Sequence, residues 1–178
     1  GAAPITHFDA SKFKTQFACE VKNFNAADHF DRRKARQLDL YAQYALVAAR
    51  QAVADSGMEE AQNLDKNRVG VIIAAGIGGL HTFEEEAGYY AVHEDQGPKY
   101  NPFFIPKMIA DIASGHVSME YGYHGPNFGV VSACASSNNA IIDAFNLIRL
   151  GKADAIVTGG AEAAIYPAGV GGFNSMHA

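Results

Sequence analysis

The chain has 178 residues and a formal net charge of −5, with 48% hydrophobic and 19% charged residues. This length allows one domain with a real core and is short for two, and the composition is that of a globular protein. The negative charge argues against general binding to nucleic acids or membrane surfaces, and no apolar run approaches the roughly 20 residues that span a bilayer.

The two cysteines and the ends of the chain indicate a cellular location and a processing state. Cys19 and Cys134 are the only cysteines, which is no disulfide framework, and we therefore expect a reducing, cytoplasmic location. The first six residues have neither the basic start nor the apolar stretch of a signal peptide. Residue 1 is not Met, and the last residues read as continuing structure, so we expect a fragment or a cleaved product.

The first half of the chain predicts two helices around one strand. Residues 1–31 read as loop and short turns, and residues 32–56 predict a helix that Asp31 caps and Gly57 ends. Residues 68–74 are continuously apolar, as in a strand buried on both faces of a parallel sheet, and residues 80–92 predict a helix. The expected buried stripe of the first helix consists of Leu38, Tyr41, Ala45, Ala48, Ala49 and Ala52.

The second half continues the alternation of helices and strands. After a polar loop over residues 93–101, residues 107–121 predict a helix that ends at Gly122. Residues 127–133 and 153–159 predict short strands, with a helix over 135–150 between them. This alternation predicts an α/β fold with a mostly parallel sheet, and in such sheets ligands bind where strands end and helices begin.

Cys134 lies where the expected strand 127–133 meets the expected helix 135–150. A thiol at the first turn of a helix faces unpaired N–H groups and the positive end of the helix dipole, which favour the nucleophilic thiolate. The small neighbours Ala133, Ala135, Ser136 and Ser137 leave room for a substrate. The alternative is a purely structural cysteine, because free cysteines are most often buried and inert.

Other candidate sites in the chain have weaker support. The glycines of residues 76–79 follow a strand but lack the spacing of a dinucleotide loop, which favours a tight turn with close backbone approach. No two histidines are spaced i, i+4 on a helix and no C-x-x-C occurs, so we expect no metal site. His116, on an expected helix, and His124, in a turn, gain no catalytic role from their positions.

A basic run over residues 32–36 stands out in an acidic chain. It is either a solvated helix face or a docking patch for an acidic partner, through charge complementarity.

Several motifs, taken in order, resemble one enzyme family. The segments run from about Phe8 to the end of the chain and include Ser132-Ala-Cys-Ala-Ser-Ser137, Thr158-Gly-Gly-Ala-Glu-Ala163 and Gly169-Val-Gly-Gly-Phe173. Residues 55–57, 76–80, 102–106, 121–126 and 151–154 fit the same order. Together they are similar to the β-ketoacyl-[acyl-carrier-protein] synthases, most closely to the type II condensing enzymes that elongate fatty acids.

The resemblance implies a thiolase-like fold of two pseudo-symmetric halves, each with a five-stranded mixed sheet between helices. Residues 1–178 would be a single partial domain, the N-terminal half without its first strand. The family's two active-site histidines, its lysine and its second oxyanion donor belong to the other half, so this chain alone is expected not to condense and to fold poorly. The implied protein is a cytoplasmic homodimer that needs no cofactor or metal.

The resemblance also implies roles for individual residues. Cys134 would accept the acyl chain from acyl-carrier protein, and its own N–H would donate to the oxyanion; condensation with malonyl-carrier protein would follow. The acyl pocket would include Ile77, Gly169 and Phe173, and Phe104 and Ile105 would be lent across the dimer to the partner's pocket. Arg33 and Arg36 would dock the carrier protein, although Gln37 stands where the family has a further Lys.

Three alternatives stay open within this resemblance. A thiolase is disfavoured by the length and order of the motifs, and a polyketide-type ketosynthase by the residues around the cysteine. A non-catalytic partner subunit of the chain-length-factor kind would keep the fold and lose the nucleophile, so the presence of Cys134 counts against it.

Overall fold

The computed structural model describes residues 1–177, and its centre is a parallel sheet in the order β4–β3–β5. The strands are β3 (Val69–Ala74), β4 (Asn127–Phe128) and β5 (Ala155–Gly160). The central strand β3 is buried along its whole length, and its Val71 pairs with Asn127 on one side and Val157 on the other. The expected α/β architecture with a parallel sheet is confirmed.

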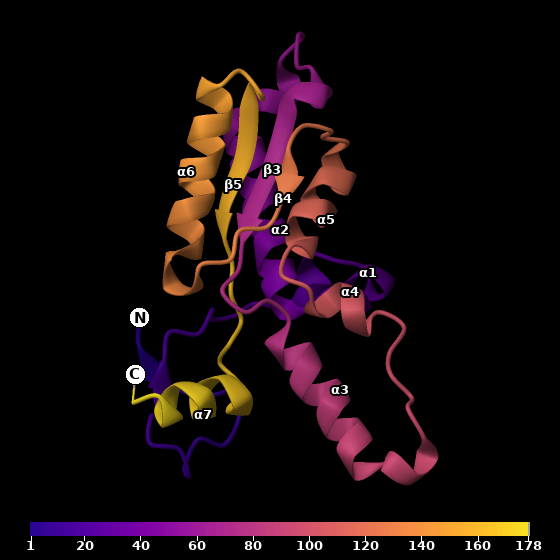
Figure 1. Ribbon diagram of the computed structural model, residues 1–178, viewed down its shortest axis with the longest axis vertical. Helices are drawn as coiled ribbons and strands as arrows, with labels where there is room; N and C mark the ends of the chain where they lie inside the picture. The colour runs from indigo at the N-terminus through magenta and orange to yellow at the C-terminus, as the bar shows by residue number, and fades with distance from the viewer. Residues whose placement is uncertain (178) are drawn as a thin grey trace.

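Helices cover both faces of this sheet (Figure 1). Helix α6 (Ser136–Arg149) packs on one face, and α2 (Leu40–Ser56) and α5 (Ile112–Tyr121) pack on the other. Because side chains alternate along a strand, Val71 and Ile73 enter the core with α2 and α5, whereas Ile72 packs against α6. Both faces of β3 are therefore apolar, which explains the continuous apolar run in its sequence.

Most of the remaining elements lie around the lower end of the sheet, whereas the two 3₁₀ turns before β3 lie at its upper end (Figure 1). Helix α3 (Leu80–Val92) with the turn after it extends away as an arm, and α7 (Pro167–Ser175) lies beside the N-terminal segment, where Phe13 approaches Gly171. A helix over residues 167–175 was not among the elements expected from sequence. These peripheral elements are β1 (Ala3–Pro4), β2 (Phe17–Ala18), α1 (Arg32–Arg36), α3 (Leu80–Val92), α4 (Phe104–Met108) and α7 (Pro167–Ser175), with 3₁₀ turns η1 (Ala26–Asp28), η2 (Met58–Glu60), η3 (Lys66–Arg68), η4 (Glu94–Gln96) and η5 (Ala133–Ala135).

The single helix expected over residues 32–56 is wrong, because the chain breaks between α1 and α2. Asp39 is extended and caps α2, where its Oδ1 accepts the Tyr41 N–H at 3.2 Å. Its Oδ2 accepts both the N–H and the hydroxyl of Thr82 in α3, at 3.1 and 2.6 Å. A buried carboxylate with three donors anchors α2 to α3, and this contact between distant segments outweighs the local preference for a continuous helix.

The caps and the buried stripe of this region agree in part with expectation. Asp31 caps α1, and Gly57 ends α2 in the left-handed conformation, as predicted. Ala48 and Ala52 are exposed, contrary to prediction. The buried face instead includes Ala42, Gln43, Leu46 and Val53 beside Tyr41, Ala45 and Ala49.

The helix expected over residues 107–121 also divides in two, into α4 and α5. Its break at residues 109–111 is held from α2, since the Tyr41 hydroxyl donates to the Ile109 carbonyl at 2.5 Å. The extended backbone of Ile109 ends α4, and Gly122 ends α5 as predicted.

The strand expected over residues 127–133 has only two residues, Asn127 and Phe128. The reason is the buried Ser114 of α5, whose hydroxyl accepts the Ile73 N–H at 2.8 Å and donates to the Phe128 carbonyl at 2.9 Å. The hydroxyl stands where a direct bond between the strands would continue the ladder. The chain therefore leaves the sheet after Phe128 and turns toward the start of α6.

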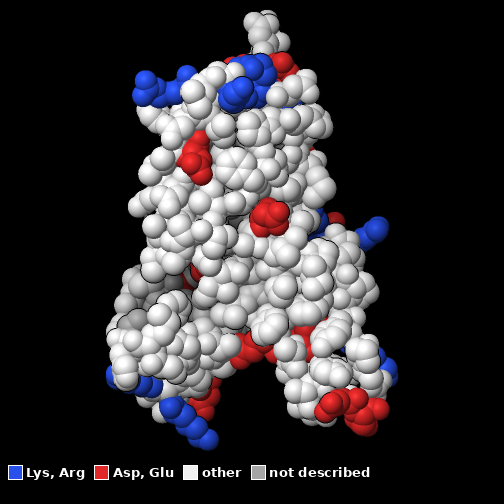
Figure 2. Space-filling model, viewed as in Figure 1, with Lys and Arg blue, Asp and Glu red and all other residues white. Residues whose placement is uncertain are grey.

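Helix α6 presents large apolar side chains to the surface. Ile141, Ile142 and Phe145 are 50%, 53% and 57% exposed, and in the view of Figure 2 the middle of the molecule is largely free of charged side chains. Monomeric soluble proteins rarely expose large continuous apolar patches. This face therefore has the character of a surface that another part of a protein covers.

Within residues 1–177, none of the helices has both the length and the apolar character needed to cross a bilayer.

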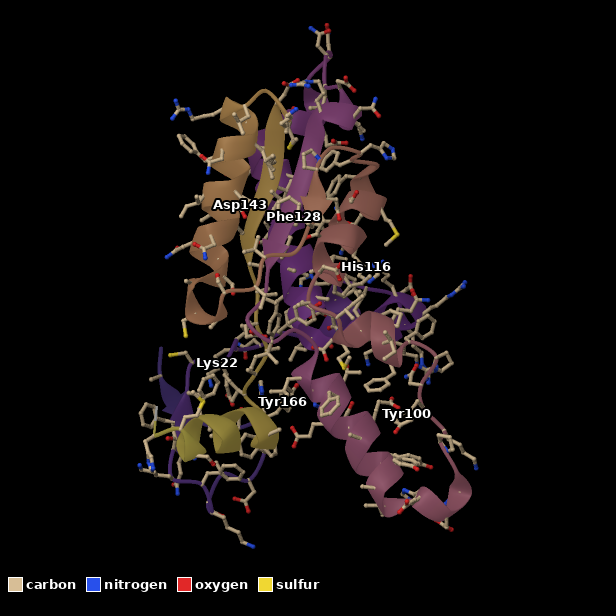
Figure 3. All side chains as sticks on the ribbon, in the orientation of Figure 1. Lys22, Tyr100, His116, Phe128, Asp143 and Tyr166 are labelled. Atoms are coloured by element: carbon tan, nitrogen blue, oxygen red, sulfur yellow. The ribbon has the colours of Figure 1, made fainter. Side chains whose placement is uncertain are left out.

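His116 predicts a pH dependence of stability. Its ring on α5 (Figure 3) lies 3.3 Å from the Lys34 Nζ of α1, and burial together with that ammonium lowers the pKa of His116 to about 4. The unfolded chain binds this proton near the ordinary pKa of about 6.5, so the free energy of unfolding falls as pH drops from about 6.5 to about 4. We expect His116→Gln to reduce the loss of stability between pH 7 and pH 5, measured by urea unfolding.

The matched control for this change is His124→Gln, because His124 is exposed in the loop between α5 and β4. It should leave the pH dependence of the unfolding free energy as it is. Equal losses of stability in the His116→Gln and unsubstituted proteins would contradict the prediction.

Candidate functional site

Cys134 lies on a sharp turn between the end of the sheet and α6. It belongs to the 3₁₀ turn η5, one residue before the N-cap Ala135, rather than to the first α-helical turn that the sequence predicted. The preceding Ala133 has φ of +50°, a left-handed conformation that costs a non-glycine residue on the order of 1–3 kcal/mol. A strained turn at the start of a helix therefore carries the sulfur.

The buried hydroxyl of Ser136 holds this turn closed. It accepts the Ser132 N–H at 2.8 Å and donates to the Ala133 carbonyl at 2.7 Å. The Asn139 Nδ2, one turn along α6, donates to the Ser132 hydroxyl at 2.7 Å. These hydrogen bonds compensate the strain at Ala133 and fix the backbone on both sides of Cys134.

The turn borders a cavity of about 390 Å³, and the Cys134 side chain, which is exposed, lines it. The walls come from the ends of β3 and β5, from the turn itself and from α7. Small apolar residues dominate, and Glu162 is the one charged residue among the described residues of the lining. The lining residues are Ala74, Ala75, Gly76, Ile77, Ala133, Cys134, Ser136, Ser137, Gly160, Ala161, Glu162, Ala164 and Phe173. A narrow apolar chain and a thiol-reactive carbonyl fit this combination.

Two of the three residues expected in an acyl pocket line this cavity, namely Ile77 and Phe173. Gly169 is instead a packing position of α7: a Cβ there would lie 2.1 Å from the Ala164 carbonyl oxygen, so only glycine fits. The wall residue Phe173 follows it one turn later. Gly169 thus allows α7 to pack closely against Ala164, and Phe173 on the same helix forms part of the cavity wall.

Phe104 and Ile105, expected to be lent to a dimer partner, lie on the short helix α4. The Phe104 ring stacks on Tyr100 with centroids 5.3 Å apart, whereas Ile105 is 54% exposed. Neither residue lines the cavity beside Cys134.

The basic run forms one wall of a separate hollow. Arg32, Arg33 and Arg36 are exposed on α1, and with Gln37 and Phe103 they line a depression of about 480 Å³. Within the described part of the chain, none of these arginines forms an ion pair. Their charge is therefore available to an anionic partner.

The glycine-rich loop after β3 confirms the expected close backbone approach. The Gly79 N–H donates to the Met108 carbonyl at 3.0 Å, and a Cβ at Gly79 would lie 2.4 Å from the Lys107 carbonyl oxygen. The loop packs directly on the backbone of α4. Among residues 1–177, no group of three or more His, Cys, Asp or Glu side chains is placed to hold a metal ion.

Sequence reasoning assigned no role to two residues of the site, Ser136 and Glu162. Ser136 was noted only as a small neighbour of Cys134, and Glu162 only as part of a motif. Their hydrogen-bond partners lie on backbone atoms, which leave no mark in the residue types of the partner segments. A serine two positions after a candidate nucleophile is the one local signal that could have indicated the closed turn.

Known proteins resemble this chain over its whole length. Residues 2–178 match the family model described as "Beta-ketoacyl synthase, N-terminal domain". The 3-oxoacyl-[acyl-carrier-protein] synthase 2 of Staphylococcus aureus is 42% identical over 182 residues, covering 100% of this chain and 43% of that protein. The protein of the same name from Synechocystis sp. is 42% identical over 179 residues, covering 100% of this chain and 42% of its own length.

A solved structure supports the same assignment of the fold. The ishigamide ketosynthase/chain length factor superposes with a TM-score of 0.80 at 26% identity, covering 99% of this chain and 43% of that chain. The expected thiolase-like ketosynthase fold is confirmed. The chain spans less than half the length of the curated relatives that it matches.

The closed turn predicts a large effect of Ser136→Ala. Loss of the hydroxyl leaves the partly buried Ser132 N–H without its acceptor and releases the strained Ala133, so we expect the free energy of unfolding to fall by about 1–3 kcal/mol. Alkylation of Cys134 by iodoacetamide should slow relative to Cys19, measured by peptide mass spectrometry, because the sulfur is no longer held at the helix start.

Ser56→Ala is the control for this change. That serine also makes side-chain hydrogen bonds, to the Val53 carbonyl and from the Met58 N–H, but at the far end of α2. It should leave the ratio of Cys134 to Cys19 alkylation unaltered. The same ratio in Ser136→Ala as in the unsubstituted protein would show that the hydroxyl does not position the sulfur.

Proposed function

The chain belongs to the β-ketoacyl synthase family, and from this premise we propose that the whole protein is a 3-oxoacyl-[acyl-carrier-protein] synthase of fatty-acid elongation. One observation carries the proposal: Cys134, on a strained turn at the start of α6, lines an apolar cavity in a chain 42% identical to enzymes of that name. A nucleophilic sulfur beside an apolar cavity suits transfer of an acyl chain.

In the proposed reaction, the Cys134 thiolate attacks the thioester carbon of an acyl-carrier protein. The acyl–sulfur bond to the carrier breaks, the acyl chain becomes bound to Cys134, and the carrier thiol leaves with a proton. Malonyl-carrier protein then loses CO₂, and its carbanion attacks the new thioester and expels the Cys134 thiolate. The product is a β-ketoacyl chain that is two carbons longer.

The turn supports a further role for the Cys134 backbone. We propose that its N–H donates to the oxyanion that forms when the thioester is attacked, since donors held in place before reaction stabilise developing charge. The closed turn keeps this N–H in a fixed orientation, because the Ser136 hydroxyl, two residues after Cys134, binds the backbone of Ser132 and Ala133 before it.

The cavity walls support a pocket for the acyl chain. Ile77 and Phe173 line the space beside the sulfur, and we propose that they limit the chain that enters. Gly169 contributes by seating the helix that carries Phe173. The exposed Ile105, with the neighbouring Phe104, is proposed to complete the pocket of a second copy in a homodimer.

The exposed apolar face of α6 supports a single partial domain over residues 1–178. Its large side chains are about half exposed, and the chain covers 43% of its relative from Staphylococcus aureus. We propose that the rest of the protein packs on this face and supplies the groups that decarboxylate the malonyl substrate. A cytoplasmic location is part of the same proposal, because elongation uses carrier-bound substrates.

Two other functions remain as alternatives. A polyketide-type ketosynthase is favoured by the superposition on the ishigamide ketosynthase/chain length factor, but that likeness is 26% identical against 42% for the fatty-acid synthases. A non-catalytic subunit of the chain-length-factor kind needs no nucleophile. Cys134 at the cavity therefore counts against the second alternative.

The nucleophile is tested by selective alkylation of the native protein. We expect cerulenin or iodoacetamide to label Cys134 faster than Cys19, although both thiols are exposed, and Cys134→Ala to abolish condensation. The measurement is peptide mass spectrometry over time together with an elongation assay on acyl- and malonyl-carrier protein. Labelling of Cys134 that is no faster than that of Cys19 would end the proposal.

Carrier docking is tested by charge reversal on α1. Arg33→Glu with Arg36→Glu should weaken carrier-protein binding by about tenfold or more at low salt and by less at high salt, because exposed charges are screened. Lys12→Glu, on the exposed N-terminal loop, is a matched reversal outside the hollow. Equal affinities of the double variant and the unsubstituted protein, measured by titration calorimetry, would exclude this surface.

A further inference from the structure

The loop that carries Ile77 is held from one side by α4. Gly79 donates its N–H to the Met108 carbonyl at 3.0 Å, and the backbone of Gly78 and Gly79 presses against residues 107–110. Ile77 itself is 43% exposed, and its side chain forms part of the wall of the Cys134 cavity. The position of the Ile77 side chain therefore also depends on the groups that hold the loop on the side away from α4.

The opposite side is held by the carboxylate of Glu162. Its Oε2 accepts the Ile77 N–H at 2.8 Å, and its Oε1 accepts the Gly78 N–H at 3.2 Å. Hydrogen bonds to an ionised carboxylate are about twice as strong as neutral ones, and two adjacent donors on one carboxylate restrict rotation of the loop. Gly76 allows this approach, since a Cβ there would lie 2.8 Å from Oε2.

The strand register fixes where this carboxylate stands. β3 and β5 are parallel neighbours, and Ala74 at the end of β3 pairs with Gly160 at the end of β5. Glu162 follows β5 by two residues and Ile77 follows β3 by three, so both leave the same edge of the sheet. The carboxylate thus ties one strand end to the loop after the other.

Glu162 also borders a second space. Besides the cavity of about 390 Å³, it lines a smaller one of about 30 Å³ together with Tyr44 and Tyr166. Tyr166, at the start of α7 (Figure 3), stacks on His81 of α3 with ring centroids 3.9 Å apart. The wall behind the carboxylate is therefore firmly packed, and Glu162 is the side chain common to both spaces.

We propose that Glu162 is a positioning residue that determines acyl-chain selectivity: its carboxylate fixes the backbone of Ile77 and so sets the length of chain that the Cys134 cavity admits. This role rests on the proposed function, because it concerns the same cavity. Release of the loop lets Ile77 withdraw, and loss of the carboxylate opens the main cavity toward the smaller one. Longer chains then enter more easily.

The test compares alkylation of Cys134 by iodoacetamide and by N-dodecyl iodoacetamide in the native protein. In each reaction the thiolate displaces iodide, so only the chain length differs. We expect Glu162→Ala, which removes both hydrogen bonds to the loop, to raise the ratio of the dodecyl rate to the iodoacetamide rate by about tenfold or more. Glu162→Gln keeps one acceptor oxygen and should raise the ratio by less. If Glu162→Ala does not fold, the ratio measured for Glu162→Gln tests the inference.

A double-variant cycle tests whether Glu162 acts through Ile77. Ile77→Ala alone should raise the same ratio, and addition of Glu162→Ala should then change it by less than about twofold, because both changes release the same wall. Glu60→Ala, an exposed carboxylate on η2, should leave the ratio unchanged. An unchanged ratio in the Glu162 variants, or an effect that adds fully to that of Ile77→Ala, would overturn the inference.

The same data separate this inference from the proposed function. Rapid labelling of Cys134 over Cys19 by iodoacetamide in the unsubstituted protein supports the nucleophile, whatever the Glu162 variants do. A selective Cys134 with an unchanged dodecyl ratio in the Glu162 variants rejects only the role of Glu162.

Discussion

Burial of β3 on both faces is the constraint on which the rest of this structure depends. Its six residues are fully covered, by α6 on one side and by α2 and α5 on the other, so the strand must lie at the centre of the sheet. The chain then leaves β3 and its parallel neighbour β5 at the same edge. The loop with Ile77 and the segment with Glu162 meet there, beside the turn that carries Cys134.

Short polar side chains decide where the regular elements stop. Asp39 joins the start of α2 to Thr82, the Ser114 hydroxyl ends β4, and the Ser136 hydroxyl closes the turn before α6. Each of these groups is buried, and a buried polar group is costly unless it finds a partner. The chain therefore bends to satisfy it, even where the local sequence favours a longer helix or strand.

The surface divides into regions of different character. The face of α6 is apolar and exposed, the hollow beside α1 is lined by arginines, and the cavity is apolar with a single carboxylate among its described lining residues. These three properties suit three different contacts: a further part of the protein, an acidic carrier and an acyl chain. Cys134 lies beside this cavity, on a turn that the Ser136 hydroxyl holds closed.

The sequence by itself determined the α/β class, the central apolar strand, the caps at Asp31 and Gly57 and the position of Cys134 before a helix. Each of these depends on neighbouring residues, through periodicity, capping and strand burial. The ordered motifs also indicated the family correctly. The tertiary structure alone decided the breaks at residues 37–39 and 109–111, the two-residue length of β4, the place of Gly169 outside the cavity wall and the hydrogen bonds of Glu162 to the loop after β3. Apart from the contact of Gly169 with the nearby Ala164, these features depend on hydrogen bonds between distant segments, such as that between Glu162 and Ile77, which are 85 residues apart. A single sequence carries no local pattern for such partners.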